Sequence, residues 1–572
     1  MQEPISGAEI LMRSLIDEGV DRIFGYPGGA IMPVYDALYD YNDRLNHVLV
    51  RHEQAATHAA EGYARVSGRV GVCLVTSGPG ATNTITGIAD AMMDSTPIVV
   101  IMGQVGVPLL GSDAFQECDV VDVTMPICKW SYQIRSAKDI AWAVSRAFYI
   151  ASTGRPGPVV LDFTKSAQLE KAVYEHAAVD FIRSYVPVPK TDKESIIQAA
   201  NLINAAERPL VLVGQGVELG NANAEVREFI EKAGAPFGAT LHGLSAVPTD
   251  HPLHVGMLGM HGSIGANKNT QQCDLIIAIG MRFDDRITGN LNTYATQAKK
   301  IHFEIDPSEV NKNVKVDVAV LGDCKTTVQA VTELLVKREH NEWRDSFKVY
   351  DEMETSQVIE PQIHPTEGPL RMGEVVRRVS ELTEHKAVMC TDVGQNQMMS
   401  ARYFKFTQPR SVATSGGMGT MGYGLPAAMG ATFGAPDRTV CVFMGDGGFQ
   451  MVIQELGTIM EYQTPVKMIL LDNEYLGNVR QWQELFFNNR LSFTPMKNPN
   501  FAKIAEAYNI PCRIVTERAD LDDAIREMLT TDGPFLLHTA VMPEDNIWPM
   551  VYPGKDIDDV VIRQTGDEII KA

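Results

Sequence analysis

The segment TVCVFMGDGGFQMVIQELGTIMEYQTPVKMILLDNEYLG (Thr439–Gly477) carries the strongest structural signal in this chain. Its two apolar runs, 440–444 and 466–471, are typical of buried parallel strands, and a helical pattern lies between them. The first run ends in Gly445-Asp446-Gly447-Gly448, and the second is followed by Asp472-Asn473. Because successive strand ends emerge at one edge of a doubly wound sheet, we expect Asp446 and Asn473 to face one another there.

The side chains that follow these two strands suit a magnesium ion bound to a diphosphate group. The carboxylate of Asp446 and the amide oxygen of Asn473 are hard ligands, which Mg²⁺ accepts together with phosphate oxygens and water. The residues Gly445, Gly447 and Gly448 let backbone N–H groups and the start of the next helix approach an anion. An aspartate in a strand-to-helix turn is also common as a simple helix cap, so the turn alone is a weak signal.

Length and composition describe a globular protein of several domains. With 572 residues the chain exceeds the size of one hydrophobic core and predicts about three domains. The hydrophobic share of 45% is ordinary, and the net charge of −21 argues against nucleic acid or an anionic membrane as a partner. The eight cysteines show no CxxC or metal spacing, which indicates reduced thiols. Neither a signal-peptide pattern nor an apolar run of about 20 residues is visible, so we expect a cytoplasmic protein that does not enter the membrane.

Alternating strand and helix patterns predict an α/β fold with three doubly wound parallel-sheet domains. The strand-like runs are 21–24, 47–50, 70–76, 97–102 and 158–162 in the first domain, 209–213, 274–279 and 300–305 in the second, and 387–391 after a helix at 372–382 in the third. The predicted domains are 1–185, 194–345 and 369–545, joined by linkers at 185–193 and 342–368 and followed by a C-terminal tail at 546–572.

Two further segments suggest ligand contacts. Arg51-His52-Glu53-Gln54-Ala55 follows a predicted strand, so the Glu53 carboxylate reaches the ligand edge of the first sheet. An acid in a first helical turn also stabilises the helix by itself, which is the simpler explanation for Glu53. The segment Thr414–Pro426, TSGGMGTMGYGLP, has a glycine density that permits close backbone approach to a ligand or, alternatively, makes a mobile loop.

The GDG turn and Asn473, with 25 residues between Gly447 and Asn473, resemble the cofactor motif of thiamine diphosphate enzymes. In that family GDG is followed at similar spacing by two asparagines, and the first of these is Asp472 here. In the family the second asparagine is the metal ligand, so the difference at position 472 leaves this ligand, Asn473, unchanged. The resemblance implies that Mg²⁺ is held by Asp446, Asn473 and the backbone oxygen of Tyr475.

The resemblance also implies how the organic part of thiamine diphosphate is bound. Glu53 is expected to hydrogen-bond a ring nitrogen of the aminopyrimidine, Gly419 to meet its amino group, and Met421 to keep the cofactor bent. The diphosphate loop is matched by Gly394, Gln395 and Asn396, with Asn396 where relatives usually carry histidine. The implied thiamine diphosphate set is therefore Glu53, Gly394, Gln395, Asn396, Gly419, Met421, Gly445, Asp446, Gly447, Gly448, Asn473, Tyr475 and Gly477.

Within these enzymes the chain is most similar to the acetohydroxyacid synthase (acetolactate synthase) catalytic large-subunit family. The matching runs cover nearly the whole sequence: FGYPGGAIMPVYDAL (24–38), LVTSGPGATN (74–83), SDAFQECDVV (112–121), TGRPGPV (153–159), LGMHG (258–262), MRFDDRITGN (281–290), TSGGMGTMGYGLPAA (414–428) and QWQELF (481–486).

This family resemblance implies four residues at the substrates. Trp482 is expected to shape the pocket for the second ketoacid and to favour 2-ketobutyrate, although an isolated tryptophan is usually packing. Arg286 is the candidate for the acceptor carboxylate, since a guanidinium fork binds carboxylates in a bidentate way, and an exposed Arg–Asp pair is the alternative. Gln116 and Lys165 match residues of the substrate channel, with DFTKSA around Lys165 departing from the usual pattern.

A flavin is the third implied cofactor. The family binds FAD in the central domain without using its redox chemistry, whereas Gly214-Gln215-Gly216 alone is only part of a dinucleotide fingerprint. Asp306 and Asp323 follow strands and suit ribose hydroxyls. The implied flavin contacts are Arg155, Gly214, Gly216, Met260, His261, Arg282, Asp306 and Asp323.

The resemblance thus predicts decarboxylative carboligation of pyruvate with a second pyruvate or with 2-ketobutyrate. It implies a homodimer or dimer of dimers, because in the family Glu53 and Asp446 serve one cofactor from different subunits, and it implies a small regulatory subunit. Two alternatives stay open. One is a pyruvate oxidase or decarboxylase with the same fold and cofactors, and the other is a non-catalytic flavin-binding homologue.

Overall fold

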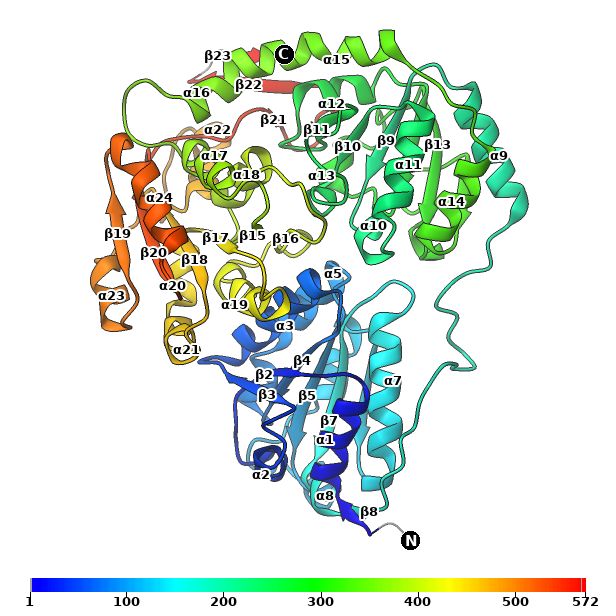
Figure 1. Cartoon of the computed structure of the whole chain (residues 1–572), viewed down its shortest axis with the longest axis vertical. Coiled ribbons are helices and arrows are strands. Elements are labelled where there is room, and N and C mark those ends of the chain that lie inside the picture. Colours follow the sequence, from blue (N-terminus) through cyan, green and yellow to red (C-terminus); the bar gives the residue numbers. More distant parts are fainter. Residues whose placement is uncertain (1–2, 567) are drawn as a thin grey trace.

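The computed structural model describes residues 3–566 and 568–572 and contains three parallel sheets of six strands each, every one flanked by helices. The three units follow one another along the chain and meet around a common centre (Figure 1). This arrangement confirms the predicted α/β class with three doubly wound sheets. None of the described helices is long and apolar enough to cross a membrane.

The N-terminal unit has the strand order β3-β2-β4-β5-β7-β6. Its central strands are the predicted apolar runs, because a strand buried on both faces needs apolar side chains at every position. The sequence did not reveal β6, a half-buried edge strand with the polar run WSYQI. The strands are β2 (Arg22–Gly25), β3 (Asn46–Leu49), β4 (Gly71–Val75), β5 (Ile98–Gln104), β6 (Trp130–Ile134) and β7 (Val159–Thr164), and the longer helices are α1 (Gly7–Asp17), α2 (Met32–Tyr39), α3 (Glu53–Ser67), α5 (Ile85–Met93) and α7 (Ile140–Ser152).

The central unit repeats the architecture with the order β11-β10-β9-β12-β13-β14. Three of its strands were predicted, while the short strands toward the two edges carry too few apolar residues to be recognised. Its strands are β9 (Pro209–Val213), β10 (Phe237–Ala239), β11 (His254–Met257), β12 (Leu275–Ile279), β13 (Lys299–Glu304) and β14 (Val318–Leu321), covered by α9 (Lys193–Ala205), α11 (Asn223–Ala233), α12 (Ile264–Thr270) and α14 (Cys324–Leu334).

The third unit has the order β16-β15-β17-β18-β20-β19, with the two strands of the 439–477 segment at its middle. Between them the predicted helical segment is interrupted at Val452, whose φ of −133° is not helical, so it forms α20 and α21. The elements are α17 (Met372–Leu382), β15 (Val388–Thr391), α18 (Gln395–Tyr403), β16 (Val412–Ala413), α19 (Gly424–Gly434), β17 (Val440–Gly445), α20 (Asp446–Met451), α21 (Leu456–Tyr462), β18 (Val466–Asp472), α22 (Gly477–Phe486), α23 (Phe501–Ala507), β19 (Cys512–Val515), α24 (Leu521–Thr530) and β20 (Phe535–Ala540).

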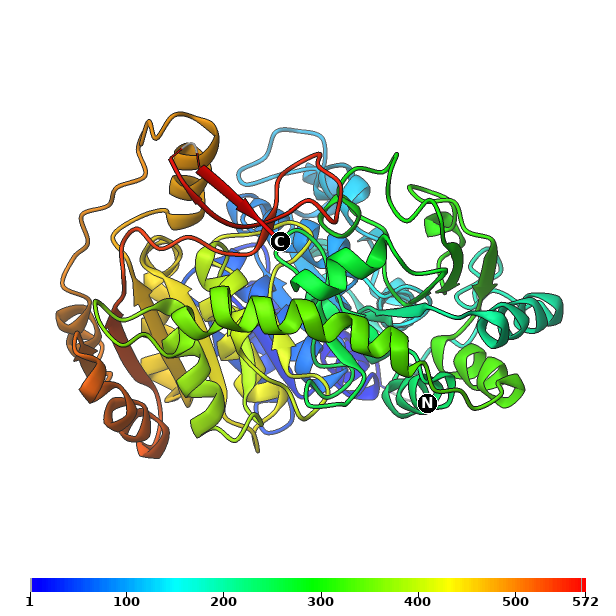
Figure 2. The same ribbon diagram turned by 90° about the horizontal axis from the view of Figure 1, so that it is seen from above.

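The prediction of an irregular linker at 342–368 is wrong. Most of this stretch is helical: α15 (Asn341–Glu354) continues through 355–359 into α16 (Glu360–Ile363). Seen from above, this helical stretch runs from the central unit across to the third (Figure 2). Most of its charged residues face solvent, although Glu354 is buried beside Arg402. Trp343 and Phe347, four residues apart, are buried against the central sheet, and Tyr350 and Met353 are half-buried against the same cluster. The many charged residues between these few apolar ones explain why the sequence of α15 looks like a linker.

The C-terminal segment is also more ordered than a tail. Beyond the third sheet, β21 (Met550–Val551), β22 (Val560–Thr565) and β23 (Glu568–Lys571) form a small antiparallel sheet. Val551 and Val560 are buried in one cluster with Leu210 of the central sheet. The Val551 N–H donates to the Met260 carbonyl at 2.8 Å, so the segment supports a loop of the central unit.

The N-terminal and third units pack through two helices of small residues, α3 and α19. A Cβ on Gly62 would lie 1.9 Å from the Ala427 oxygen, and one on Gly430 would lie 1.8 Å from the Ala59 oxygen. The two helix backbones therefore approach too closely for any larger residue at either glycine. The eight cysteines are free, as predicted.

Candidate active site

Asp446 and Asn473 lie at neighbouring strand ends, as predicted. Strands β17 and β18 pair in register up to Gly445 and Leu471, and the next residues leave the sheet at the same edge. Asp446 and Asn473 are buried, with exposed fractions of 1% and 2%. Asp446 Oδ2 accepts a hydrogen bond of 2.6 Å from Asn498 Nδ2, which also donates to Asp472 Oδ1 at 2.8 Å.

The electrostatics of this edge favour a bound cation. Burial, followed by the nearby charge of Asp472, raises the pKa of Asp446 to about 7. Burial opposes ionisation of Asp472 too, but its 2.8 Å bond with His538 Nε2 holds the pKa of Asp472 below its usual value. A buried carboxylate of this kind costs free energy unless a cation accompanies it. The carboxylate, the amide oxygen of Asn473 and the nearby backbone oxygen of Tyr475 form a ligand set that fits Mg²⁺.

The start of α18 lies against the same edge. Gln395 Oε1 accepts from Asn473 Nδ2 at 3.2 Å, and a Cβ on Gly477 would lie only 2.1 Å from that oxygen, so glycine is required there. Asn396 Nδ2 is 3.4 Å from the Cβ position of Gly445, and its buried Oδ1 has no hydrogen-bond partner. Gly394, Gln395 and Asn396 therefore stand beside the glycine turn, with an unpaired amide oxygen that can accept a hydrogen bond or bind a cation.

The glycine-rich segment 414–421 completes this group. Gly419 has φ +66°, a backbone conformation that only glycine adopts readily. The Met421 side chain extends to the GDG turn, because its Cε is 3.5 Å from the Cβ position of Gly447. The structure therefore brings the loop predicted to grip the pyrimidine next to the turn predicted to bind the diphosphate.

Glu53, Gln116 and Lys165 lie at the carboxyl edge of the N-terminal sheet. Glu53 is the first residue of α3, directly after β3, and its Oε2 accepts from Asn83 Nδ2 at 2.9 Å. Gln116 packs against Gly78, in the turn that leads to Asn83. Lys165 Nζ donates to the Gly29 carbonyl at 3.3 Å.

These three residues form a group separate from Asp446. Within the described residues, no hydrogen bond or ion pair joins Glu53 to the third unit, and none of the three lines the large cavity described below. The nearest connection is through Arg51, whose N–H donates to Glu455 Oε1 at 3.1 Å. Within the described chain, Glu53 and Asp446 thus belong to two separate groups of polar residues.

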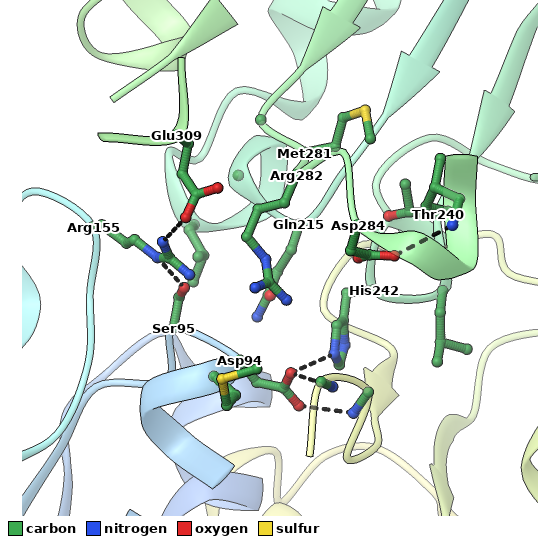
Figure 3. A pocket seen from close by; sticks show the side chains of 18 of the residues that line it. Asp94, Ser95, Arg155, Gln215, Thr240, His242, Met281, Arg282, Asp284 and Glu309 are labelled. Carbon is green, nitrogen blue, oxygen red and sulfur yellow. Dashed lines mark hydrogen bonds and ion pairs between the residues drawn. The ribbon is translucent and has the colours of Figure 1, made fainter. Parts of the chain in front are cut away.

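A cavity of about 730 Å³ lies between the three units (Figure 3). Its volume is within the usual range for a cofactor or ligand site. It extends from the strand ends of the central sheet to two loops of the third unit, at residues 393–394 and 416–419. Of the predicted residues, its wall includes Arg155, Gly216, Met260, His261, Arg282, Arg286, Asp323, Gly394, Gly419 and Trp482. Two predicted flavin contacts, Gly214 and Asp306, do not line it.

The polar groups of the cavity suit a ligand with anionic and hydroxyl groups. Arg282 points into the space (Figure 3) and makes no ion pair with any described residue. Arg155 is held by Glu309 at 2.7 Å and by Asp306 at 3.4 Å, which explains the position of Asp306 behind the wall. Burial lowers the pKa of His261 to about 4, so this imidazole is neutral at pH 7. Arg282 is therefore a cation available to a ligand anion.

Trp482 and Arg286 both line the cavity. The Trp482 ring lies 5.4 Å from Phe486, which in turn lies 5.0 Å from Tyr552 of the C-terminal segment. Arg286 is largely exposed, and its guanidinium makes only a long contact of 3.8 Å with the Asp285 carboxylate. The guanidinium is therefore available to a ligand carboxylate. Their common location fits the predicted pocket for the second ketoacid.

Sequence reasoning missed Asp94, His242 and Asn498. Asn498 lies in a polar, proline-containing loop without a motif, and only the folded chain brings it to Asp446. Asp94 is completely buried at the end of α5, accepts from Arg65 and the N–H groups of Gly416 and Gly417, and lies 3.2 Å from His242 Nε2. Two acids four residues apart in the apolar run ITGIADAMMD were a usable signal, because buried helices rarely carry unpaired acids.

The other acid of that run, Asp90, belongs to a buried group with His58 and Glu61. Their nearest ligand atoms lie within 4.8 Å of one another, and neither oxygen of Asp90 has a hydrogen-bond partner. Burial, followed by the charge of Asp94, raises the pKa of Asp90 to about 6, and burial also raises the pKa of Glu61. Shared protons between the two carboxyl groups relieve this charge, so the group needs no metal ion.

Asp90→Asn should therefore become increasingly stabilising as the pH rises. Folded Asp90 holds its proton more tightly than the unfolded chain, whose value is 3.8, so wild-type stability falls between about pH 4 and pH 6. Each unit of pKa difference corresponds to about 1.4 kcal/mol. Melting temperatures across this range should show the difference between variant and wild type growing with pH. Asp94→Asn should show the opposite slope, and only below about pH 4, because the pKa of Asp94 is lowered from the unfolded value of 3.8. A pH-independent difference for Asp90→Asn would contradict the assignment.

Comparison with known proteins agrees with this geometry. Three descriptions of the thiamine pyrophosphate enzymes match in order: the N-terminal TPP binding domain over residues 5–123, the central domain over 196–331 and the C-terminal TPP binding domain over 392–539. The fold and the site thus define a thiamine pyrophosphate enzyme.

Full-length relatives narrow the class further. The chain is 43% identical to the acetolactate synthase isozyme 2 large subunit of Escherichia coli (strain K12), covering 96% of this chain and 98% of the relative. It is 43% identical to the large subunit of Parasynechococcus marenigrum (strain WH8102), covering 97% and 90%. It is 40% identical to that of Lactococcus lactis subsp. lactis (strain IL1403), covering 99% and 98%. The chain belongs to the acetolactate synthase large-subunit family, which confirms the resemblance inferred from its motifs.

Proposed function

We propose that this chain joins two 2-ketoacids with loss of carbon dioxide. Two pyruvates give 2-acetolactate, and pyruvate with 2-ketobutyrate gives 2-aceto-2-hydroxybutyrate, the first common step of branched-chain amino acid biosynthesis. The observation that carries the proposal is one chain that combines Glu53 at one sheet edge, Asp446 and Asn473 at another, and the Trp482–Arg286 wall. Similarity over the full length to acetolactate synthase large subunits supports it.

The proposed site holds thiamine diphosphate and Mg²⁺. When bound, this cofactor supplies a carbon nucleophile and accepts the electron pair left by decarboxylation. Asp446, Asn473 and the Tyr475 backbone oxygen would bind Mg²⁺, while residues 394–396 and the glycine turn would bind the diphosphate. Glu53 would hold a proton at a pyrimidine nitrogen, and Asn83 orients its carboxylate at 2.9 Å.

FAD is the proposed occupant of the large cavity. Arg282 is available for its phosphate groups, and Asp323, at the start of α14, is available for a ribose hydroxyl. The reaction itself needs no flavin redox step, because two pyruvic acid molecules contain the atoms and electrons of acetolactic acid plus carbon dioxide. We therefore propose a non-redox role for the flavin.

We propose that two copies of the chain assemble the active sites. The separation of Glu53 from Asp446 within one chain supports this, since a second copy can bring the complementary half-site. A homodimer or a dimer of such dimers fulfils the requirement. The relatives are named large subunits, which supports a small regulatory subunit as a further partner. A cytoplasmic location is proposed on the same basis as the sequence expectation.

Product analysis of the purified protein with pyruvate tests the proposed function. Acetolactate should form only with thiamine diphosphate and Mg²⁺, without oxygen uptake, and omission of FAD should lower the rate. Acetyl phosphate with oxygen consumption would instead indicate a pyruvate oxidase, and acetaldehyde a decarboxylase. Absence of turnover with all three cofactors bound would indicate a non-catalytic homologue.

Trp482→Leu should reduce the preference for 2-ketobutyrate over pyruvate as acceptor. The indole lines the same cavity as Arg286, and a smaller side chain would remove apolar contact with the extra methyl group of 2-ketobutyrate. One methylene in such a pocket contributes about 1–3 kcal/mol, so the product ratio should shift by about tenfold or more. The ratio of the two products is measured with both acceptors competing. Phe486→Leu, behind Trp482, serves as the control with a smaller shift, and an unchanged ratio for Trp482→Leu would contradict the pocket assignment.

A further inference from the structure

One buried carboxylate connects all three units at the wall of the large cavity. Asp94, at the end of α5 in the N-terminal unit, accepts from Gly416 N at 2.8 Å and from Gly417 N at 2.7 Å in the third unit. It also accepts from Arg65 Nη2 at 3.0 Å and lies 3.2 Å from His242 Nε2 of the central unit. Figure 3 shows Asp94 and His242 pointing toward one another at the cavity wall.

These contacts lie between the two proposed cofactor sites. Asp94, His242 and residues 416–419 all line the cavity proposed for FAD. The N–H groups that Asp94 holds come only a few residues before Gly419 and Met421, which are proposed to grip the thiamine cofactor. A Cβ on Gly417 would lie 3.4 Å from Arg282 Nη2, so this segment also abuts the cation available to the flavin.

The electrostatics keep Asp94 charged. Burial opposes ionisation, but the charge and hydrogen bond of His242, together with Arg65 and the Gly416 N–H, hold the pKa of Asp94 well below its usual range. A buried anion with several donors fixes their relative positions, because loss of any one leaves an unpaired polar group in a dry site. A displacement of His242 by a ligand in the cavity must therefore be transmitted to the 416–417 backbone.

We infer that Asp94 is a positioning residue that couples occupancy of the central cavity to the conformation of the segment 416–421, so that FAD and thiamine diphosphate bind cooperatively. The inference rests on the proposed cofactors. For this coupling, the segment 416–421 must have two conformations, and both ligands must bind more tightly to the same one. This is the condition for a coupling free energy between two sites. Asp94 need not touch either cofactor for this role.

The test compares FAD dissociation constants, measured by flavin fluorescence, with and without saturating thiamine diphosphate and Mg²⁺. In wild type, thiamine diphosphate should tighten FAD binding by about fivefold or more. In Asp94→Asn this ratio should fall close to one, because the isosteric amide cannot accept from both glycine N–H groups and Arg65. Asp162→Asn is the control: it changes an equally buried acid of the N-terminal unit whose hydrogen bonds come from Gln104 and Gln133 and not from the segment, and it should keep the wild-type ratio.

The outcomes separate this inference from the proposed function. A wild-type ratio of one, or an unchanged ratio in Asp94→Asn, would overturn the coupling while leaving both cofactors in place. Failure of wild type to bind FAD at all would overturn the flavin proposal and the coupling together. If Asp94→Asn does not fold, His242→Ala removes the central-unit partner from the less buried side, and it should also reduce the ratio. An unchanged ratio there would overturn the role of this contact.

Discussion

Replacement of Glu53 by glutamine should lower the rate of acetolactate formation by about 10²–10⁴-fold, which is the usual loss when a proton-transfer partner is removed. Glutamine keeps the size of the side chain and its hydrogen bond from Asn83, but it cannot hold and exchange a proton with a pyrimidine nitrogen. FAD should stay bound, because Glu53 does not line the large cavity. Steady-state kinetics at saturating thiamine diphosphate, combined with the flavin absorbance of the purified variant, measure both quantities.

The same helix supplies the control for this experiment. Glu61 lies two turns further along α3, is completely buried, and has a raised pKa caused by burial. Because its protonated form resembles glutamine, Glu61→Gln should change the rate by no more than a few fold. Turnover of Glu53→Gln close to that of Glu61→Gln would refute the role of Glu53. A loss of FAD along with activity would show that the substitution disturbed the fold instead.

The sheets of all three units were predictable because their central strands are buried on both faces. Runs such as 440–444 and 466–471 are apolar at every position except Lys467, so composition and length identify them without tertiary information. Edge strands lack this property: β6 is half exposed and carries a mixed sequence. The sequence of helix α15 resembles a linker because its few apolar residues, chiefly Trp343 and Phe347, stand among many charged ones. Its position is decided by the central sheet and the C-terminal segment, which a local pattern does not contain.

The residues of the candidate site likewise include some that the local sequence predicts and others that only the folded chain brings together. Residues that follow a strand directly, such as Glu53, Asp446 and Asn473, were predictable because a parallel sheet brings its strand ends to one edge. Residues that reach the site across long sequence separations were not. Asn498 meets Asp446 over 52 residues and Asp94 meets Gly416 over 322, and neither separation leaves a local pattern. Where a residue belongs to a shared family motif, the resemblance named it as a candidate, and two such residues, Arg282 and Trp482, line the cavity.

Asp446→Asn should raise the Mg²⁺ concentration needed for half-maximal activity about 10²-fold or more, because it weakens metal binding. Even supporting residues outside the ligand set typically contribute 10–100-fold to metal affinity. Asparagine fits the same space and still accepts from Asn498, but it lacks the charge that a divalent ion balances. The apparent affinity for thiamine diphosphate should fall in parallel, because the ion joins the diphosphate to the protein. Titration of Mg²⁺ and of thiamine diphosphate against acetolactate formation measures both effects.

The neighbouring acid distinguishes a metal ligand from a general requirement for negative charge. Asp472 shares the Asn498 amide with Asp446, but its other oxygen is bound to His538, and the family pattern has asparagine at this position. Asp472→Asn removes the same charge from the same sheet edge and should leave the Mg²⁺ dependence within a few fold of wild type. If both variants needed equally higher Mg²⁺ concentrations for activity, the total negative charge of this sheet edge would bind the ion, and Asp446 would not be a specific ligand. If Asp446→Asn alone kept wild-type Mg²⁺ dependence, the metal would be bound elsewhere, and the proposed cofactor site would be wrong.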